Sequence, residues 1–162
     1  MKTKDMRSKT CCFTGHRRIP VDEYETVKLR VRDTVIKAIR NRYCYFGAGG
    51  SWGFDMLAAQ TVLELKNEYS KIYLILVLPC RTQIKYWNDN NKREYERILK
   101  SADKIVWISD KYTSDCMFKR NRHLVDYSSL CICYLTKNTG GTAYTVQYAI
   151  SKGLEIINIS SQ

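Results

Sequence analysis

The chain has 162 residues, of which 44% are hydrophobic, and this composition excludes a disordered protein and leaves room for one domain with a sizeable core. Its 27 Lys and Arg residues outnumber its 16 Asp and Glu residues, which gives a formal net charge of +11. The surface is therefore expected to favour anionic partners such as nucleotides, nucleic acid or acidic lipid headgroups.

Apolar, strand-like runs alternate with amphipathic, helix-like runs along the whole chain. After a polar extension at residues 1–9, strands are predicted at 10–14, 43–46, 72–78, 105–108, 130–135 and 155–159. Between them, helices are predicted at 22–42, 54–68, 91–101, 116–127 and 142–152. Several of the strands are apolar at consecutive positions, which is typical of strands that are covered on both faces of a sheet.

This regular alternation of strand and helix predicts an α/β fold. Residues 1–162 are expected to form a single Rossmann-like domain, with a mostly parallel sheet of about six strands and helices on both faces. In such sheets, ligands bind outside the carboxyl ends of the strands, at the point where the strand order reverses. The loops expected at that edge are 15–18, 47–53, 79–81, 109–111 and 136–142.

Two glycine runs, 47–53 and 139–142, each lie between a predicted strand and a predicted helix. Their candidate ligand-binding residues are Gly49, Gly50, Ser51, Trp52, Gly53, Gly140, Gly141 and Thr142. Turns without β-carbons let backbone N–H groups approach an anion, and the positive end of the following helix adds to the attraction. Either run alone is equally compatible with a tight turn that binds nothing, and Trp52 can pack against ligand, core or a partner subunit. Together the two runs favour a site for a nucleotide-like ligand.

Polar side chains in the same loops are candidates for contacts with such a ligand. Gly15 and His16 follow the first strand, where His16 can donate a hydrogen bond to a phosphate and Arg17 can form a bidentate contact. The alternative is that His16 caps a turn and that Arg17 belongs to a solvated basic edge. Asp55 lies in the first turn of the predicted helix 54–68, where it can bind a ribose hydroxyl, act as a base, or simply favour the helix N-terminus.

The predicted helix 116–127 carries a further polar group. An ion pair between Arg122 and Asp126, four residues apart, would leave Arg120 and Asn121 free for a ligand. An Asn side chain can read an adenine edge or hold a ribose hydroxyl. Arg120 and Asn121 are therefore added to the candidate ligand-binding residues.

Five short motifs stand out when they are taken in chain order. They are Cys12-Phe13-Thr14-Gly15-His16-Arg17 with Pro20, Gly49-Gly50-Ser51-Trp52-Gly53-Phe54-Asp55 with Ala58-Ala59, Leu78-Pro79-Cys80 with Gln83 and Trp87, Arg120-Asn121-Arg122, and Gly140-Gly141-Thr142. This set resembles the YpsA-like branch of the SLOG superfamily from about residue 9 to residue 160. The superfamily includes the DNA-processing protein DprA and the LOG phosphoribohydrolases. The resemblance implies a Rossmann-like fold that holds nucleotides or their derivatives, and a homo-oligomer.

The sequence departs from the LOG pattern at one position that matters for catalysis. LOG enzymes carry a motif of the form G-G-x-G-T-x-x-E, whose glutamate takes part in cleaving the N-glycosidic bond. The corresponding residues here run from Gly141 to Thr145 and end in threonine. A hydroxyl cannot replace a carboxylate that stabilises an oxocarbenium-like transition state. The catalytic residue is therefore unassigned, with Asp55 as the candidate.

Three functions of different classes are compatible with these residues. The first is a binding protein that senses or sequesters a nucleotide-derived small molecule such as an ADP-ribose-like signal. The second is a nucleotide N-glycosidase in which Asp55 or another carboxylate replaces the missing glutamate. The third is a DprA-like binder of single-stranded DNA, which the charge favours but the even spread of cations along the chain disfavours. We expect the first, with no cofactor.

The cysteines and the lack of long apolar segments bear on where the protein resides. The seven cysteines are an odd number without a C-x-x-C pair, and most lie in strand-like runs, which is typical of reduced, buried thiols in a cytoplasmic protein. With only two histidines, a metal site is not expected. Residues 1–9 do not resemble a signal peptide, and no apolar run approaches the roughly 20 residues that a membrane helix needs. A soluble protein without a membrane partner is expected.

Overall fold

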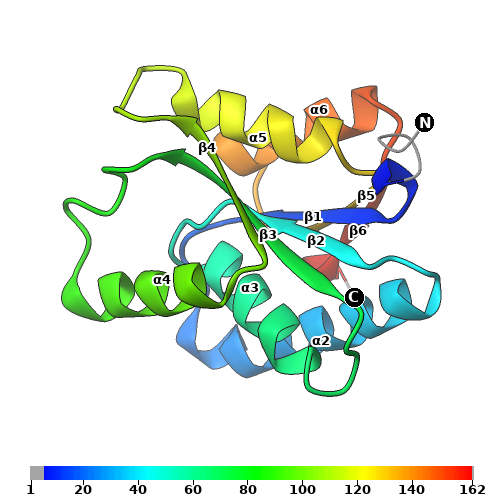
Figure 1. Cartoon of the computed structure of the whole chain (residues 1–162). Coiled ribbons are helices and arrows are strands. Elements are labelled where there is room, and N and C mark those ends of the chain that lie inside the picture. Colours follow the sequence, from blue (N-terminus) through cyan, green and yellow to red (C-terminus); the bar gives the residue numbers. More distant parts are fainter. Residues whose placement is uncertain (1–5, 162) are drawn as a thin grey trace.

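The computed structural model of the chain describes residues 6–161 and shows a sheet between two layers of helices (Figure 1). Of the polar extension predicted at residues 1–9, residues 1–5 lie outside the described part, and residues 6–8 form a helical turn that leads into the first strand. None of the helices in the described part is long and apolar enough to cross a membrane.

The six predicted strands and five predicted helices are all present, with ends that differ by a few residues. The strands are β1 (Thr10–Gly15), β2 (Tyr45–Ala48), β3 (Tyr73–Cys80), β4 (Lys104–Ser109), β5 (Leu130–Tyr134) and β6 (Glu155–Asn158). The helices between them are α2 (Tyr24–Arg40), α3 (Phe54–Leu65), α4 (Asp89–Ser101), α5 (Cys116–Asp126) and α6 (Gly141–Ser151). Two short 3-10 helices that the sequence did not predict are η1 (Val21–Glu23) and η2 (Ile159–Ser161).

Local hydrogen bonds explain two of the differences in element ends. β2 begins later than predicted because the N–H groups of Cys44 and Tyr45 both donate to the carbonyl of Lys9, at 3.0 and 3.1 Å, which interrupts the regular ladder. α4 begins earlier than predicted because the side chain of Asn88 accepts a hydrogen bond from the N–H of Asn91 at 2.8 Å and caps the helix.

The six strands form one parallel sheet in the order β4-β3-β2-β1-β5-β6. The chain steps outward from β1 to β4 and then places β5 on the other side of β1, in register from Cys11 opposite Leu130 to Gly15 opposite Tyr134. The strand order therefore reverses between β1 and β5. By the rule for open α/β sheets, a ligand is expected outside the carboxyl ends of these two strands.

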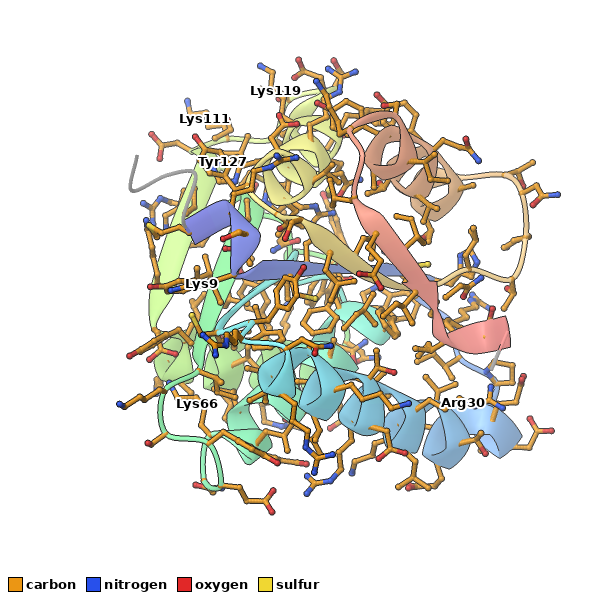
Figure 2. The ribbon with its side chains drawn as sticks, turned by 90° about the vertical axis from the view of Figure 1, so that its right-hand side faces the viewer. Lys9, Arg30, Lys66, Lys111, Lys119 and Tyr127 are labelled. Carbon is orange, nitrogen blue, oxygen red and sulfur yellow. The ribbon has the colours of Figure 1, made fainter. Side chains whose placement is uncertain are left out.

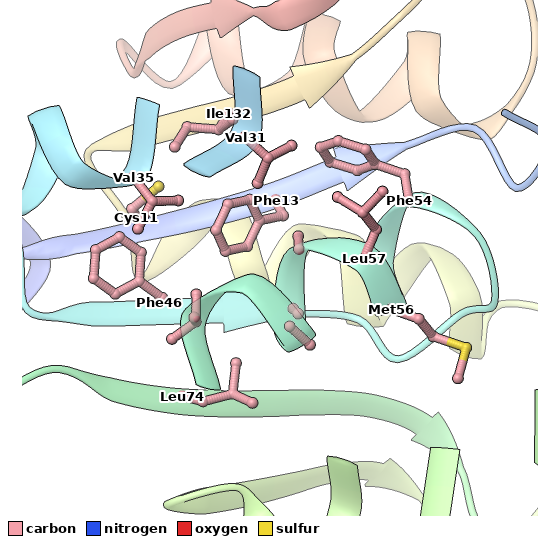
Figure 3. Packing of buried hydrophobic residues seen from close by; sticks show 14 of the residues in the cluster. Cys11, Phe13, Val31, Val35, Phe46, Phe54, Met56, Leu57, Leu74 and Ile132 are labelled. Atoms are coloured by element: carbon pink, nitrogen blue, oxygen red, sulfur yellow. The ribbon is translucent and has the colours of Figure 1, made fainter. Parts of the chain in front are cut away.

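Helices α2, α3 and α4 cover one face of the sheet, and α5 and α6 cover the other (Figure 1). Figure 3 shows the core beneath α2 and α3, where Phe13 from β1 and Phe46 from β2 pack beside Val31 and Val35 from α2. The rings of Phe13 and Phe46 stack with centroids 6.2 Å apart, and Phe54 meets Phe13 edge-on at 6.5 Å. This packing fixes the first turn of α3 against the carboxyl end of β1, where the candidate site begins.

All seven cysteines are unpaired thiols, and every one except the half-buried Cys44 is buried. Burial raises the pKa of the Cys133 thiol to about 12 and raises the pKa of Cys11 well above its ordinary value. The thiols of Cys11 and Cys133 are therefore protonated at neutral pH and pack as small apolar side chains. Within residues 6–161, no group of three or more His, Cys, Asp or Glu side chains is placed to hold a metal ion.

Candidate functional site

A cavity of about 770 Å³ opens at the carboxyl ends of β1 and β5, where the strand order reverses. It is lined by the loop after β1, by η1, by the start of α3, by α5 and by the loop between β5 and α6. The candidate residues that line it are Gly15, His16, Arg17, Ser51, Asp55, Arg120, Asn121, Gly140, Gly141 and Thr142. The candidate residues that do not line it are Gly49, Gly50, Trp52 and Gly53.

The turn before α6 presents its backbone to this cavity. Gly140 has a φ of +98°, a left-handed conformation that favours glycine, and it precedes the first residue of α6. Gly140 and Gly141 are exposed, and a β-carbon added to either would meet no other atom within 4 Å. Within residues 6–161, the N–H groups of Gly141 and Thr142 have no hydrogen-bond partner. The positive end of α6 thus faces open space in the cavity.

Cationic and hydrogen-bonding side chains surround this turn. The N–H of Thr136 donates to Nε2 of His16 at 3.0 Å, which ties the loop after β1 to the loop after β5. Burial, together with the nearby Lys137, lowers the pKa of His16, so its ring is neutral at neutral pH with the proton on Nδ1. The exposed Arg17 and Arg18 also line the cavity. The rim therefore favours an anion and offers donors to it.

The floor of the cavity contains a buried carboxyl group. Asp55 lies in the first turn of α3, is only 8% exposed, and accepts a hydrogen bond from the N–H of Ser51 at 3.3 Å. Burial raises the pKa of Asp55 to about 6, although the charges of Arg120 and Arg17 and the Ser51 hydrogen bond act in the opposite direction. A carboxyl with this pKa can accept hydrogen bonds as an anion or donate a proton near neutral pH.

Arg120, on α5, is a buried cation on the same floor. It is 5% exposed, and its guanidinium donates to the carbonyl of Gly49, to Oδ1 of Asn121 at 2.7 Å and to the sulfur of Met117 at 3.6 Å. Among the described residues it forms no ion pair within 4 Å, so its charge is compensated only at longer range, by Asp55. A thioether is a weak acceptor, and part of the donor capacity of the guanidinium is therefore left for a ligand.

The first glycine run is packed against protein rather than opened to the cavity. Added β-carbons would overlap the Arg120 guanidinium at Gly49, the Leu78 side chain at Gly50 and the Arg17 carbonyl at Gly53. Gly50 and Gly53 also have φ values of +73° and +90°. The glycines at 49, 50 and 53 are therefore needed for close packing of the loop. Of the residues in this run, only Ser51 lines the cavity.

Nine further lining residues were not among the individual candidates, and three of them bear on the charge and shape of the cavity. Glu23 comes from η1, Tyr134 is the last residue of β5, and Lys137 follows in the next loop. The ring of Tyr134 stacks on Phe54 at 5.9 Å and meets His16 edge-on at 6.0 Å, while burial and the charge of Glu23 raise its pKa. Tyr134 was not recognised because the strand was predicted to run to residue 135, whereas β5 ends at Tyr134.

Arg122 on α5 and Thr145 on α6 make hydrogen bonds that bear on two of the sequence predictions. Arg122 donates to the hydroxyl of Tyr144 at 2.7 Å, whereas Asp126 accepts from Tyr148 at 2.7 Å, so the expected pair between Arg122 and Asp126 is wrong. The hydroxyl of Thr145, where LOG enzymes have glutamate, donates to the carbonyl of Gly141 at 2.9 Å. Thr145 is buried and does not line the cavity.

Comparisons with known proteins agree with this architecture. The YpsA family model, described as the YspA SLOG family, matches residues 11–158. The SPbeta prophage-derived protein YoqJ of Bacillus subtilis is 28% identical over 139 residues, which cover 75% of this chain and 81% of that protein.

Two solved structures share the fold at low sequence identity. DNA processing protein A from Streptococcus pneumoniae superimposes with a TM-score of 0.66 at 16% identity, over 93% of this chain and 50% of that one. DNA processing protein A from Helicobacter pylori, described by its single-stranded DNA binding mode, gives 0.64 at 18% identity, over 96% of this chain and 66% of that one. This chain thus spans half to two thirds of the length of these two proteins.

Proposed function

The chain belongs to the YspA SLOG family, and from that premise we propose that it binds a nucleotide-derived anion in the cavity between β1 and β5 without hydrolysing it. The observation that carries the proposal is the exposed turn at Gly140 and Gly141. Its free N–H groups and the positive end of α6 point into a cavity whose rim is cationic. A phosphate at this position would accept backbone hydrogen bonds and meet no β-carbon.

The floor of the cavity supports a nucleotide in preference to inorganic phosphate. Asp55 and Arg120 place an acceptor and a donor in the same buried area. Paired ribose hydroxyls can donate to a carboxylate and accept from a guanidinium at once, so both buried charges gain partners when such a group binds. The volume of about 770 Å³ lies in the range of about 300–1,000 Å³ that is typical of sites for small molecules.

The proposal that the ligand is bound but not hydrolysed rests on Thr145, the fifth residue of α6. The hydroxyl of Thr145 is used inside the helix, so no carboxylate approaches the cavity from this side. Loss of such an anion removes several kcal/mol of electrostatic stabilisation from an oxocarbenium-like transition state. Ground-state binding of phosphate does not depend on that carboxylate.

The binding proposal is tested by calorimetry with AMP and ADP-ribose on the protein and on Thr142→Glu. A glutamate in the first turn of α6 suits the helix dipole, so the fold should be as stable as that of the parent or more stable. The same carboxylate repels a phosphate on that turn, so affinity should fall at least about tenfold. Asn90→Glu is the control, since it adds the same charge to the first turn of α4, away from the cavity. Equal affinities for the two variants would contradict the proposal.

One observation favours a nucleotide N-glycosidase as a second candidate. Asp55 is buried in the cavity, and its pKa of about 6 suits a group that donates a proton near neutral pH. The test is incubation with a panel of nucleoside monophosphates, with free base measured by chromatography. Release at an enzyme-like rate that Asp55→Asn abolishes would replace the binding proposal, whereas we expect no release above background.

The third class, a binder of single-stranded DNA, has weaker support from this chain. Figure 2 shows the labelled cations Lys9, Arg30, Lys66, Lys111 and Lys119 well separated from one another and on different segments of the chain. A DNA backbone needs a continuous cationic track. We therefore expect a labelled oligothymidine to bind weakly and to be lost between 50 and about 200 mM salt.

A further inference from the structure

A second, smaller cavity lies next to the first, on the side of α3 and α4. Its volume is about 240 Å³, and it is bounded by the loop after β1, the start of α2, the first turns of α3 and the start of α4. Its apolar lining consists of Ile19, Tyr24, Trp52, Met56 and Leu57. Trp52 lines this smaller cavity and does not line the larger one.

Arg17 lines both cavities and therefore forms the wall between them. Its guanidinium carbon lies 5.8 Å from the centre of the Trp52 ring, which is within the range of a cation–π contact. Trp52 is half-buried, and Tyr24 keeps 38% of its surface exposed. Arg17, Trp52 and Tyr24 thus border the second cavity, beside the larger cavity, which is called the crevice from here on.

The size and polarity of the second cavity suit a ring and not a whole nucleotide. At about 240 Å³ it lies below the range of about 300–1,000 Å³ that holds complete small-molecule ligands. The amides of Gln60 and Asn91 also line it, and neither side chain has a hydrogen-bond partner among the described residues. Glu94 is held by Arg97 at 2.9 Å. Apolar walls with two free amides are typical of a site that stacks a heterocycle and contacts its polar edge.

We propose that this second cavity holds a neutral planar heterocycle belonging to the same ligand that occupies the crevice. The ligand would then carry two ring systems joined through phosphates, with Arg17 beside the linking phosphates and the second ring against Trp52. This inference rests on the proposed function, because it needs the first half of the ligand to lie in the crevice. A neutral ring is favoured over a cationic one, since Arg17 repels a cation and the carboxylate of Glu94, which also lines the cavity, is already paired with Arg97.

A matched pair of ligands tests the proposal by calorimetry. ADP-ribose and diadenosine diphosphate share an adenosine, two phosphates and a second ribose. They differ at C1 of that second ribose, where ADP-ribose has a hydroxyl and diadenosine diphosphate has an adenine. Stacking of one base on an aromatic side chain should make diadenosine diphosphate bind about tenfold more tightly. Trp52→Ala should abolish this tenfold gain and leave the affinity for ADP-ribose unchanged, which also shows that the crevice is intact. Trp52→Phe, which keeps a stacking face, should retain most of the gain.

Trp107→Ala is the control variant, because Trp107 is also half-buried beneath an arginine, with the Arg81 guanidinium 4.4 Å from its ring, but lines neither cavity. It should keep the full gain. Equal affinities for the two ligands, or a gain that persists in Trp52→Ala, would overturn the second ring site while leaving the proposed function in place. Failure of both ligands to bind the unmodified protein would overturn the proposed function and this inference with it.

Discussion

The turn before α3 and the turn before α6 both follow a parallel strand and both contain paired glycines, yet the structure gives them different neighbours. In the first, added β-carbons at Gly49, Gly50 and Gly53 would overlap protein atoms. In the second, Gly140 and Gly141 are exposed and face open space. A glycine run therefore predicts a close approach of backbone, but it does not say whether a side chain or a ligand makes that approach.

Both turns were predicted from the sequence to bind the ligand, but in the structure each contributes different groups to the cavity. The first positions Ser51 and Asp55 at the floor of the cavity and accepts a hydrogen bond from Arg120 at the Gly49 carbonyl. The second supplies the free N–H groups. Substitutions in the first turn should accordingly act on folding, and substitutions in the second should act on binding.

The largest effect is expected from Gly53→Ala. The methyl group would overlap the Arg17 carbonyl, and the φ of +90° is unfavourable for alanine, so the free energy of unfolding should fall by about 4 kcal/mol. Urea denaturation followed by circular dichroism measures this loss. A loss below about 1 kcal/mol would show that the first turn can relax and would remove the distinction between the two turns.

The second effect depends on pH and concerns the carboxyl that the first turn holds. The folded state raises the pKa of Asp55 from 3.8 to about 6, so protonated Asp55 stabilises the fold below pH 3.8 and this stabilisation is lost as the pH rises through 6. Asp55→Asn resembles the protonated form at every pH. Relative to the parent, its free energy of unfolding should therefore increase by about 2 kcal/mol between pH 4 and pH 7.

Urea titrations at several pH values measure this difference, with Asp33→Asn as the control because Asp33 is exposed on α2. The control should change the free energy of unfolding by the same small amount at each pH. A constant difference between Asp55→Asn and the parent would mean that Asp55 is solvated in the folded protein.

The smallest effects on stability are expected in the second turn. Gly141→Ala should leave the free energy of unfolding within about 0.5 kcal/mol of the parent, because Gly141 lies in α6 and a β-carbon there meets open space. Gly140→Ala should cost about 1 kcal/mol for its φ of +98°. Both methyl groups enter the space proposed for phosphate, so calorimetry with AMP should show weaker binding by both. Unchanged affinity would indicate that the second turn, like the first, is only structural.

Much of the fold could be predicted because it depends on local periodicity. The apolar run that forms β5 and the stripe of Val27, Val31 and Val35 on α2 each specify one element and the face that it buries. Parallel pairing then follows from the helices that connect the strands, whereas the order of the strands was not predicted. The reversal between β1 and β5 is what brings the loops containing His16 and Thr142 together.

The details of the candidate site depend on contacts between distant residues, which no local pattern encodes. The guanidinium of Arg120 fills the place of a side chain at Gly49, 71 residues away in the sequence. Glu23 reaches the cavity because the loop after β1 ends in η1, a turn without a strong sequence signal. Trp52 faces the smaller cavity because Gly53 allows Arg17 to lie against the start of α3.

The hydrogen bond from Thr136 to His16 joins residues that are 120 positions apart. A ribosome that adds about 5–20 residues per second needs on the order of ten seconds to add Thr136 after it has added His16. During that interval the nascent chain has one wall of the crevice and lacks the other. A ligand held between these walls can therefore bind only chains that have added β5 and the turn before α6, so it stabilises the finished fold and gives no help to the earlier steps of folding.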